Sequence, residues 1–111
     1  MVQPMSNPAD LISPAFKAFL TETPDHAKAW GDAVRALSEA SALDSKTWNL
    51  AYLAVLAAVG MDSGVPFHVK AAEAAGASRD EILSTILVGL PAAGHIVTQS
   101  LPVAVAALGD D

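Results

Sequence analysis

Two long segments without charged residues constrain the fold of this chain more than any other feature. Residues 50–59 and residues 82–108 contain no Asp, Glu, Lys or Arg. The second segment is longer than the about 20 residues that a transmembrane helix needs, but Pro91, His95 and Pro102 interrupt it. No Lys or Arg follows it to anchor a membrane-spanning helix. We therefore expect both segments to form helices that are buried in protein rather than in a membrane.

The size of the chain limits how much of these segments it can bury. The chain has 111 residues, of which 52% are hydrophobic and 16% are charged, a composition that fits one folded domain. A domain this small encloses about one helix that is apolar on every face, because its surface is large relative to its volume. We expect residues 50–59 to be buried on all sides. Because residues 82–108 are equally apolar, we expect a homo-oligomer in which neighbouring copies cover part of both segments.

Capping and proline signals divide the chain into about six helices, and no period-two strand pattern is present outside short apolar runs. The sequence therefore predicts an all-α fold, with a flexible lead-in at residues 1–12 and a single helical domain at residues 13–111. The six expected helices begin at Ser13 and Pro14, at Thr23 and Pro24, at Asp44 or Ser45, near Ser63, at a capping box of Ser78 and Glu81, and near Pro91. The first is expected to end near Leu20, the third at Gly60 and the fourth at Gly76. Pro102 is expected to kink or break the last helix.

Charge and cysteine content exclude several classes of function. The net charge is −6, and the six basic residues are scattered, so the chain lacks the basic patch that nucleic acids and anionic membranes require. It contains no cysteine, which excludes disulfides, thiolate nucleophiles and thiolate metal ligands. The first residues lack the basic and apolar regions of a signal peptide, so we expect a cytoplasmic protein. We expect no cofactor and no metal, because the three histidines lack the spacing of a metal site.

His68 is the first candidate for chemistry. Three, four and seven residues after it come Ala71, Ala72 and Ala75, so His68 lies on an apolar face of small residues in the expected helix. Its side chain is therefore expected to point into packed structure. The sequence alone favours a core histidine that is satisfied by a backbone carbonyl. It leaves open a desolvated histidine with a lowered pKa that acts as an acid or base in a pocket.

The remaining histidines and the two tryptophans offer weaker signals. His95 lies in the apolar C-terminal segment, where it needs a polar partner. It is expected either to line the same cavity as His68 or to form a hydrogen bond within an oligomer interface. His26 lies in the first turn of a helix among charged neighbours and is expected to be exposed. Trp30 and Trp48 are expected to anchor the core or an interface rather than a ligand.

A pattern over the central and C-terminal two-thirds of the chain resembles a known family. Its parts are Leu43 to Thr47, the apolar helix that ends at Gly60, His68, Ala71 and Ala72, the turn of Gly76, Ala77 and Ser78, and the run of Asp80, Glu81 and Ile82. Together these residues resemble the carboxymuconolactone decarboxylase family, which includes the alkylhydroperoxidase D-like proteins. The resemblance implies an all-α helical bundle whose subunits assemble as trimers or hexamers.

The peroxidase branch of that family uses a Cys-x-x-Cys-x-x-x-His motif and a glutamate near the start of the preceding helix. Carried onto this sequence, the histidine falls on His68, the cysteines fall on Met61 and Gly64, and the glutamate falls on Asn49. A disulfide cycle is impossible here, because neither Met61 nor Gly64 can form a sulfur–sulfur bond. The decarboxylase branch also lacks the cysteine pair.

Resemblance to the decarboxylase branch implies a lyase that acts on a lactone or an unsaturated carboxylate, with His68 as acid or base. Ser63 and Gly64, near the N-terminus of the fourth expected helix, would then hold an anionic group, and His95 and Asn49 would be further pocket residues. Two alternatives stay open. One is a catalytically silent oligomeric binding or scaffold protein with the same fold, and the other is an alkylhydroperoxidase that takes its electrons from external thiols.

Overall fold

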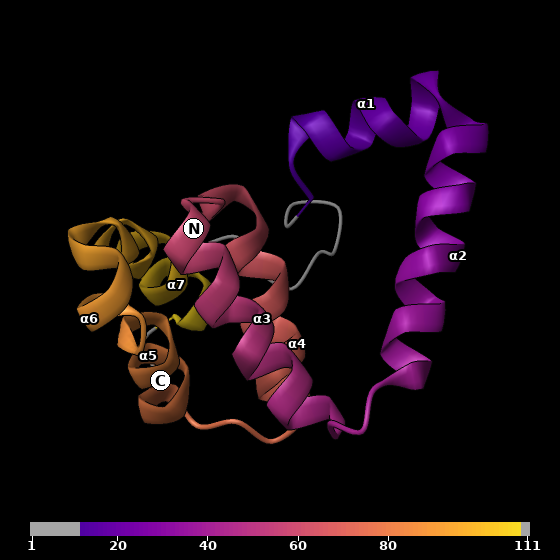
Figure 1. The fold of residues 1–111 in the computed structure, drawn as a ribbon. Helices are drawn as coiled ribbons and strands as arrows, with labels where there is room; N and C mark the ends of the chain where they lie inside the picture. The colour runs from indigo at the N-terminus through magenta and orange to yellow at the C-terminus, as the bar shows by residue number, and fades with distance from the viewer. Residues whose placement is uncertain (1–11, 110–111) are drawn as a thin grey trace.

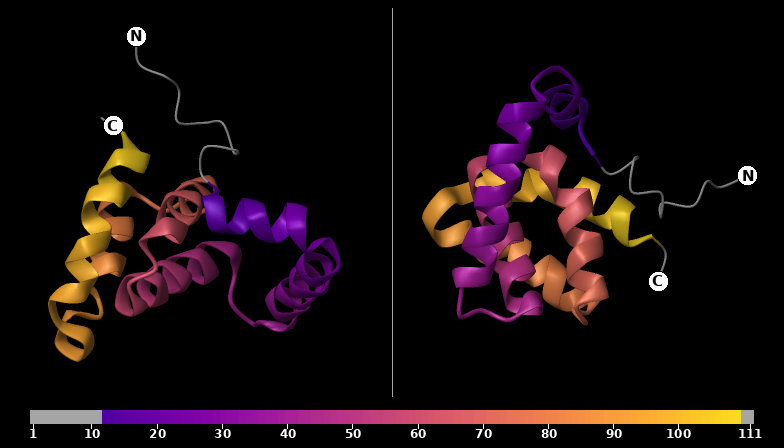
Figure 2. Two further views of the ribbon diagram at one scale, coloured as in Figure 1. Left: turned by 90° about the horizontal axis from the view of Figure 1, so that it is seen from above. Right: turned by 90° about the vertical axis from the view of Figure 1, so that its right-hand side faces the viewer.

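The computed structural model describes residues 12–109, and all regular structure in that range is helical (Figures 1 and 2). The elements are α1 (Pro14–Glu22), α2 (Pro24–Ala40), α3 (Ser45–Val59), the 3₁₀ turn η2 (Asp62–Gly64), α4 (Val65–Ala74), α5 (Arg79–Leu87), α6 (Leu90–Ala93), the 3₁₀ helix η3 (Gly94–Ser100) and α7 (Leu101–Leu108). Five of the α-helices have nine residues or more, which confirms the all-α prediction for this range. The lead-in expected at residues 1–12 lies, except for its last residue, outside the described residues.

The described chain divides into an arm and a core. The arm consists of α1 and α2, which pack against each other. The core consists of α3 to α7, in which α3 packs against α4, α5 and η3, and α4 packs against α7. Figure 1 shows the arm standing away from the core, to which residues 41–44 join it. Of the buried residues in the described range, Ala27 alone belongs to the arm.

The core is built from aliphatic side chains that no water reaches. Its largest fully buried members lie on three helices and η3: Leu53, Val65, Val69, Ile82, Ile86 and Val97. Burial of one such side chain contributes about 1.5–3 kcal/mol to folding. Ser100 is also fully buried, and its hydroxyl donates a hydrogen bond to Asp62 Oδ1 at 3.1 Å, which satisfies the polar group that burial removes from water.

Three of the expected N-caps are confirmed and one is wrong. The side-chain oxygens of Ser13, Asp44 and Ser78 each accept a hydrogen bond from the backbone N–H three residues later, at 3.1, 2.7 and 3.1 Å. Glu81 accepts from the backbone N–H of Ser78 at 2.9 Å, which completes the capping box. Thr23 occupies the N-cap position of α2, which begins at Pro24 as expected, but its side chain makes no capping hydrogen bond. Its hydroxyl donates instead to the carbonyl four residues earlier, in α1, at 2.7 Å.

The expectation that residues 50–59 are buried on all sides is wrong for the single chain. Leu53 and Leu56 are buried in the core. Val55 and Val59, on other faces of α3, are 60% and 62% exposed. An apolar pattern on every face does not say how many faces neighbouring helices will cover, and in this chain the arm leaves one side of α3 open.

The apolar stretch Arg79–Leu108 is long and hydrophobic enough to cross a membrane, by length and composition only. In the structure it folds into α5, α6, η3 and α7, none of which has more than nine residues, whereas a span needs about 20. The region from Pro91 onward, expected to be one helix with a kink or break at Pro102, is instead divided into α6, η3 and α7. The chain turns at Gly94, which has a φ of 79°, and Pro102 lies in the first turn of α7, where its missing N–H loses no hydrogen bond.

The fourth expected helix also begins later than the sequence suggests. The 3₁₀ turn Asp62–Gly64 takes up the residues near Ser63, and α4 starts at Val65 with Pro66 in its first turn. The helix ends at Ala74, and the chain reverses at Gly76, whose φ of 102° is easiest for glycine.

Gly60 ends α3, as expected, in the left-handed conformation with a φ of 76°. A side chain at this backbone conformation costs about 1–2 kcal/mol. A Cβ atom added at Gly60 would also lie 3.2 Å from Ile96 Cδ1. Glycine at this position therefore both stops the helix and lets η3 approach it.

We predict that Gly60→Ala lowers the free energy of unfolding by about 1–2 kcal/mol, because alanine is strained at this φ. Gly31 supplies the matched control, since it lies inside α2 and a Cβ atom added there meets no heavy atom within 4 Å. Gly31→Ala is expected to leave the stability unchanged or to raise it slightly. Urea unfolding followed by circular dichroism measures both variants, and an equal loss in the two would contradict the assignment.

Candidate functional site

His68 lies where α4 packs against α3, between two aromatic rings. Its imidazole stacks on the ring of Tyr52 from α3, with centroids 4.2 Å apart and an angle of 18° between the planes. The ring of Phe67 meets it edge-on, with centroids 5.3 Å apart. His68 is half-buried in this position. It is therefore neither a surface residue nor the fully enclosed core histidine that the sequence alone favoured.

Asn49 is the polar neighbour of His68. Its amide Nδ2 donates a hydrogen bond to the backbone carbonyl of Ser45 at 2.9 Å. This bond turns Asn49 Oδ1 toward His68 Nδ1, at a long contact of 3.5 Å. An amide oxygen can only accept, so the arrangement favours the tautomer in which Nδ1 carries the proton. The lone pair of the imidazole then lies on Nε2.

Partial burial decides the charge of His68. Desolvation lowers the pKa of His68 below its ordinary value of 6.5, because an apolar environment disfavours the charged imidazolium. The imidazole is therefore neutral at neutral pH. A neutral ring with its lone pair on Nε2 is a proton acceptor, which is the form that a general base requires.

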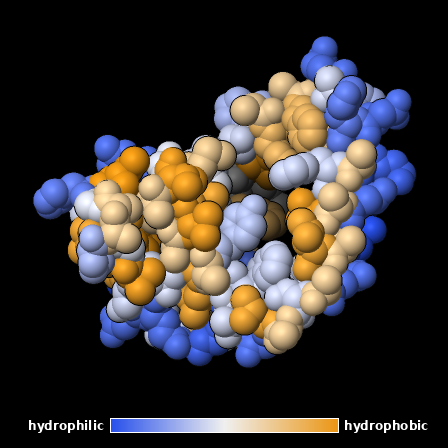
Figure 3. Space-filling model, viewed as in Figure 1, coloured by the Kyte–Doolittle hydropathy of each residue, from blue (hydrophilic) through white to orange (hydrophobic). Residues whose placement is uncertain are grey.

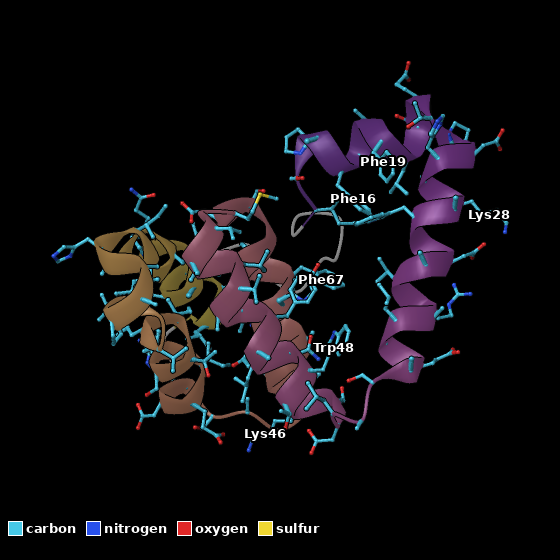
Figure 4. The ribbon with its side chains drawn as sticks, in the orientation of Figure 1. Phe16, Phe19, Lys28, Lys46, Trp48 and Phe67 are labelled. Atoms are coloured by element: carbon cyan, nitrogen blue, oxygen red, sulfur yellow. The ribbon has the colours of Figure 1, made fainter. Side chains whose placement is uncertain are left out.

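A shallow hollow of about 190 Å³ lies on the face of α3 that carries Trp48 and Tyr52. It is lined by Leu43, Trp48, Ala51, Tyr52 and Val55, and almost all of its surface is apolar. Tyr52 thus contributes both to the hollow and to the stack with His68. Figure 3 shows the hollowed region between the core and the arm, with hydrophobic side chains on both sides. Trp48 and Phe67 point into the same gap in Figure 4.

Lys46 is the basic residue closest in sequence to Asn49, and it forms an ion pair with Glu81 of α5. Its Nζ lies 2.9 Å from Glu81 Oε2, and Figure 4 shows Lys46 at the far end of α3, pointing away from the gap. The pKa of Glu81 is lowered, first by the hydrogen bond from the Ser78 backbone and then by Lys46. Lys46 therefore joins the start of α3 to the start of α5 rather than serving as an anion clamp.

Ser63 and Gly64, the residues expected to hold an anionic group, lie in the turn that precedes α4. Ser63 is exposed, and Gly64 packs against α3, where an added Cβ atom would lie 3.2 Å from Leu56 Cδ2. The carboxylate of Asp62 lies in the same turn. A carboxylate next to the start of α4 disfavours a second anion there by like-charge repulsion, so this turn is better suited to structure than to binding of a dicarboxylate.

His95 is placed apart from the other candidates. It is exposed on η3, which packs against α3, α5, α6 and α7. The carbonyl of His95 accepts a hydrogen bond from the Thr98 hydroxyl at 2.7 Å. His95 therefore does not share the surroundings of His68 within one chain. His26 is exposed, as expected.

The aromatic partners of His68 were missed at the sequence level. An apolar helix pattern does not single out Tyr52, although it is the single tyrosine of the chain. It follows Asn49 by three residues, which places both on one face of a helix. That spacing was the available signal. In the described range, no group of three or more His, Asp or Glu side chains could hold a metal ion.

We predict that Asn49→Asp raises the pKa of His68 by about one unit or more, because a carboxylate beside Nδ1 favours the imidazolium. Thr47→Asp is the matched control, since it adds the same charge two residues away, on the opposite side of α3. A proton-NMR titration of the three histidines measures the shift. An equal response of His68 to both substitutions would show that Asn49 has no special contact with it.

Comparison with known proteins agrees with the pattern seen in the sequence. Residues 24–106 match the model of the carboxymuconolactone decarboxylase family, a region that contains α2 to α6, η3, most of α7 and every residue of the site described above. Searches of curated proteins and of solved structures gave no significant match. Because the family match covers well over half of the chain, this protein belongs to the carboxymuconolactone decarboxylase family.

Proposed function

We propose that the chain is a small-molecule enzyme in which His68 Nε2 takes a proton from a carbon acid and returns it, in a lyase-type reaction on a lactone or an unsaturated carboxylate. The observation that carries the proposal is the arrangement of Asn49, His68 and Tyr52. Asn49 favours the proton on Nδ1, and stacking on Tyr52 fixes the plane of the ring. Both leave Nε2 as the nitrogen that reacts.

The proton transfer follows from the charge of the ring. The C–H bond next to a carbonyl breaks, its proton passes to Nε2, and the electron pair moves into the carbonyl as an enolate. The enolate then re-forms the carbonyl and expels a leaving group at the β carbon, so that a carbon–carbon double bond forms and the bond to the leaving group breaks, and the imidazolium gives its proton to that leaving group. If the substrate instead loses carbon dioxide, the same imidazolium protonates the carbon that has lost it. That second route needs a protonated His68 at the start, which the lowered pKa disfavours.

The surroundings of His68 indicate how a substrate is held. The hollow beside Tyr52 is apolar, and Lys46 is paired with Glu81. A ligand is therefore held mainly by contact with aromatic and aliphatic surface and much less by ion pairs. A lactone or monocarboxylate with a flat unsaturated portion suits this surface better than a dicarboxylate.

The same observations give less support to two other functions. A thiol peroxidase cycle is not available to the side chains of this chain, which has no cysteine and carries Met61 and Gly64 in the two motif positions. A catalytically silent binding or scaffold protein is favoured by one observation, the amide of Asn49 in place of a titrating carboxylate. Under that alternative His68 contributes to packing alone.

We predict that His68→Gln lowers kcat/KM at least about 100-fold, because it removes the proton-transferring group. The probe is a panel of unsaturated γ-lactones with and without a carboxylate, incubated in D₂O, with carbon-bound deuterium read by NMR. His26→Gln, which changes an exposed histidine, is the control and is expected to keep full exchange. Exchange that survives in His68→Gln would remove His68 from the reaction, and no exchange with any member of the panel would favour the silent protein.

The pH profile gives an independent prediction. A general base works only when it is neutral, so kcat/KM is expected to fall as the pH drops through the pKa of His68, which lies below 6.5. Asn49→Asp is expected to move that acid limb to higher pH, in parallel with the NMR titration. If Asn49→Asp moves the pKa of His68 in the NMR titration but leaves the acid limb of the kcat/KM profile in place, that limb belongs to another group.

A further inference from the structure

The hollow that Tyr52 lines is an elongated apolar surface along one face of α3. Trp48, Ala51, Tyr52 and Val55 are spaced by three or four residues, so they project from the same side of the helix. Val55 follows Trp48 by seven residues, which at about 1.5 Å per residue gives a floor on the order of 10 Å long. Leu43, which precedes α3, also lines the hollow. The hollow therefore suits an extended group rather than a compact one.

The hollow offers almost no polar surface to a ligand. Lys46, the basic residue closest to it in sequence, is paired with Glu81 at 2.9 Å, and the net charge of −6 repels anions. A charged or strongly hydrated group placed in the hollow would lose water without gaining a partner. The part of a ligand that occupies this surface must therefore be neutral and apolar along its length.

The two aromatic rings of the hollow favour an aliphatic occupant over a flat ring. The centroids of Trp48 and Tyr52 lie 6.5 Å apart, with 36° between the planes, which is the separation of two rings in direct contact. A third ring therefore has no space to stack between them. Leu43 and Val55 extend the surface with aliphatic groups. A flexible hydrocarbon chain can follow the whole of this floor, whereas a rigid ring contacts only part of it.

Tyr52 connects the hollow to His68. The same phenol ring lines the hollow and stacks on the imidazole, with centroids 4.2 Å apart. Figure 4 shows Trp48 of the hollow and Phe67, the edge-on neighbour of His68, pointing into the same gap. A molecule that reacts at His68 can therefore extend across Tyr52 and place its remaining atoms in the hollow.

We propose that the hollow holds an unbranched hydrocarbon chain of the substrate, so that the substrate class is a lactone or an unsaturated monocarboxylate that carries such a chain. This inference rests on the proposed function, since it takes His68 as the position of the reacting group. Three backbone bonds of an extended chain span about 3.5 Å, so a floor on the order of 10 Å accommodates about eight carbon atoms. The volume agrees with this length, because a cavity of about 150 Å³ holds benzene and the hollow measures about 190 Å³.

Ala51 is the residue that we expect to determine which chain lengths fit. It has the smallest side chain in the hollow and is exposed. Ala51→Leu adds three carbon atoms to the floor without displacing a buried group, and leucine is a good helix former. Ala106, which is exposed on α7, supplies the matched control with the same substitution. Circular dichroism is expected to show the helical content retained in both variants.

Binding of a series of γ-lactones with unbranched side chains of increasing length tests the proposal. Trp30→Phe leaves Trp48 as the single tryptophan, so the emission of the full chain then reports on the hollow. The dissociation constant is expected to fall about twofold for each added carbon, because a shallow hollow covers about half of each methylene, and to level off near about eight carbons. In Ala51→Leu, the longest lactones are expected to bind about eightfold more weakly, whereas Ala106→Leu leaves binding unchanged.

Turnover gives a second measurement on the same series. The hydrocarbon chain does not take part in the reaction, so it binds equally in the ground state and in the transition state. A longer chain is therefore expected to lower KM and to leave kcat unchanged, and Ala51→Leu is expected to raise KM alone. A kcat that falls together with kcat/KM in Ala51→Leu would contradict a role in chain binding only.

The outcomes for the hollow are distinct from those for the reaction. A dissociation constant that does not depend on chain length overturns the proposal, and so does equal weakening in Ala51→Leu and Ala106→Leu. Emission of Trp48 that changes on protein dilution but with no lactone would show that another copy of the chain covers the hollow, which also overturns it. Length-dependent binding without deuterium exchange would support the hydrocarbon site and contradict the proposed reaction. Exchange that depends on His68 but not on chain length would support the reaction and overturn the hydrocarbon site.

Discussion

The packing of α3 against α4 is the contact on which both the core and the site depend. Leu53 and Leu56 lie one helical turn apart on α3 and meet the buried valines of α4. Asn49 and Tyr52 lie at the same helical spacing on α3, so they meet α4 at His68. The aliphatic part of the interface supplies stability, and the polar part contains the proposed site. A change in the crossing angle of α3 and α4 would alter both the core and the site.

The chemistry of His68 is set by the absence of charge around it. A carboxylate in the position of Asn49 would favour the imidazolium, whereas the amide oxygen faces Nδ1–H as a hydrogen-bond acceptor without adding charge. Desolvation is then free to lower the pKa of His68. The same amide rules out a second titrating group at this position. In the proposed reaction, proton transfer therefore passes through His68 alone, which distinguishes it from the thiol-based branch of the family.

The sequence predicted those features that local interactions determine. The caps at Ser13, Asp44 and Ser78 and the glycine end at Gly60 depend on a few neighbouring residues, and the structure contains each of them. The burial of α3 depends on which helices lie against it, so an apolar pattern on every face could not reveal the exposure of Val55. The apolar helix face around His68 is visible in the sequence, whereas the position of Tyr52 against His68 depends on the packing of α3 on α4 and is not.

Exposure of the site and exposure of the arm have the same physical cause. The chain has more apolar surface than its own core can bury, and the excess lies on α2 and on the open side of α3 beside His68. A ligand that covers this side of α3 would remove water from the imidazole and lower the pKa of His68 further. It also strengthens every polar contact made there, because the local dielectric falls. Desolvation of His68 by whatever covers it would therefore stabilise the neutral form of the imidazole, which is the form that the proposed reaction requires.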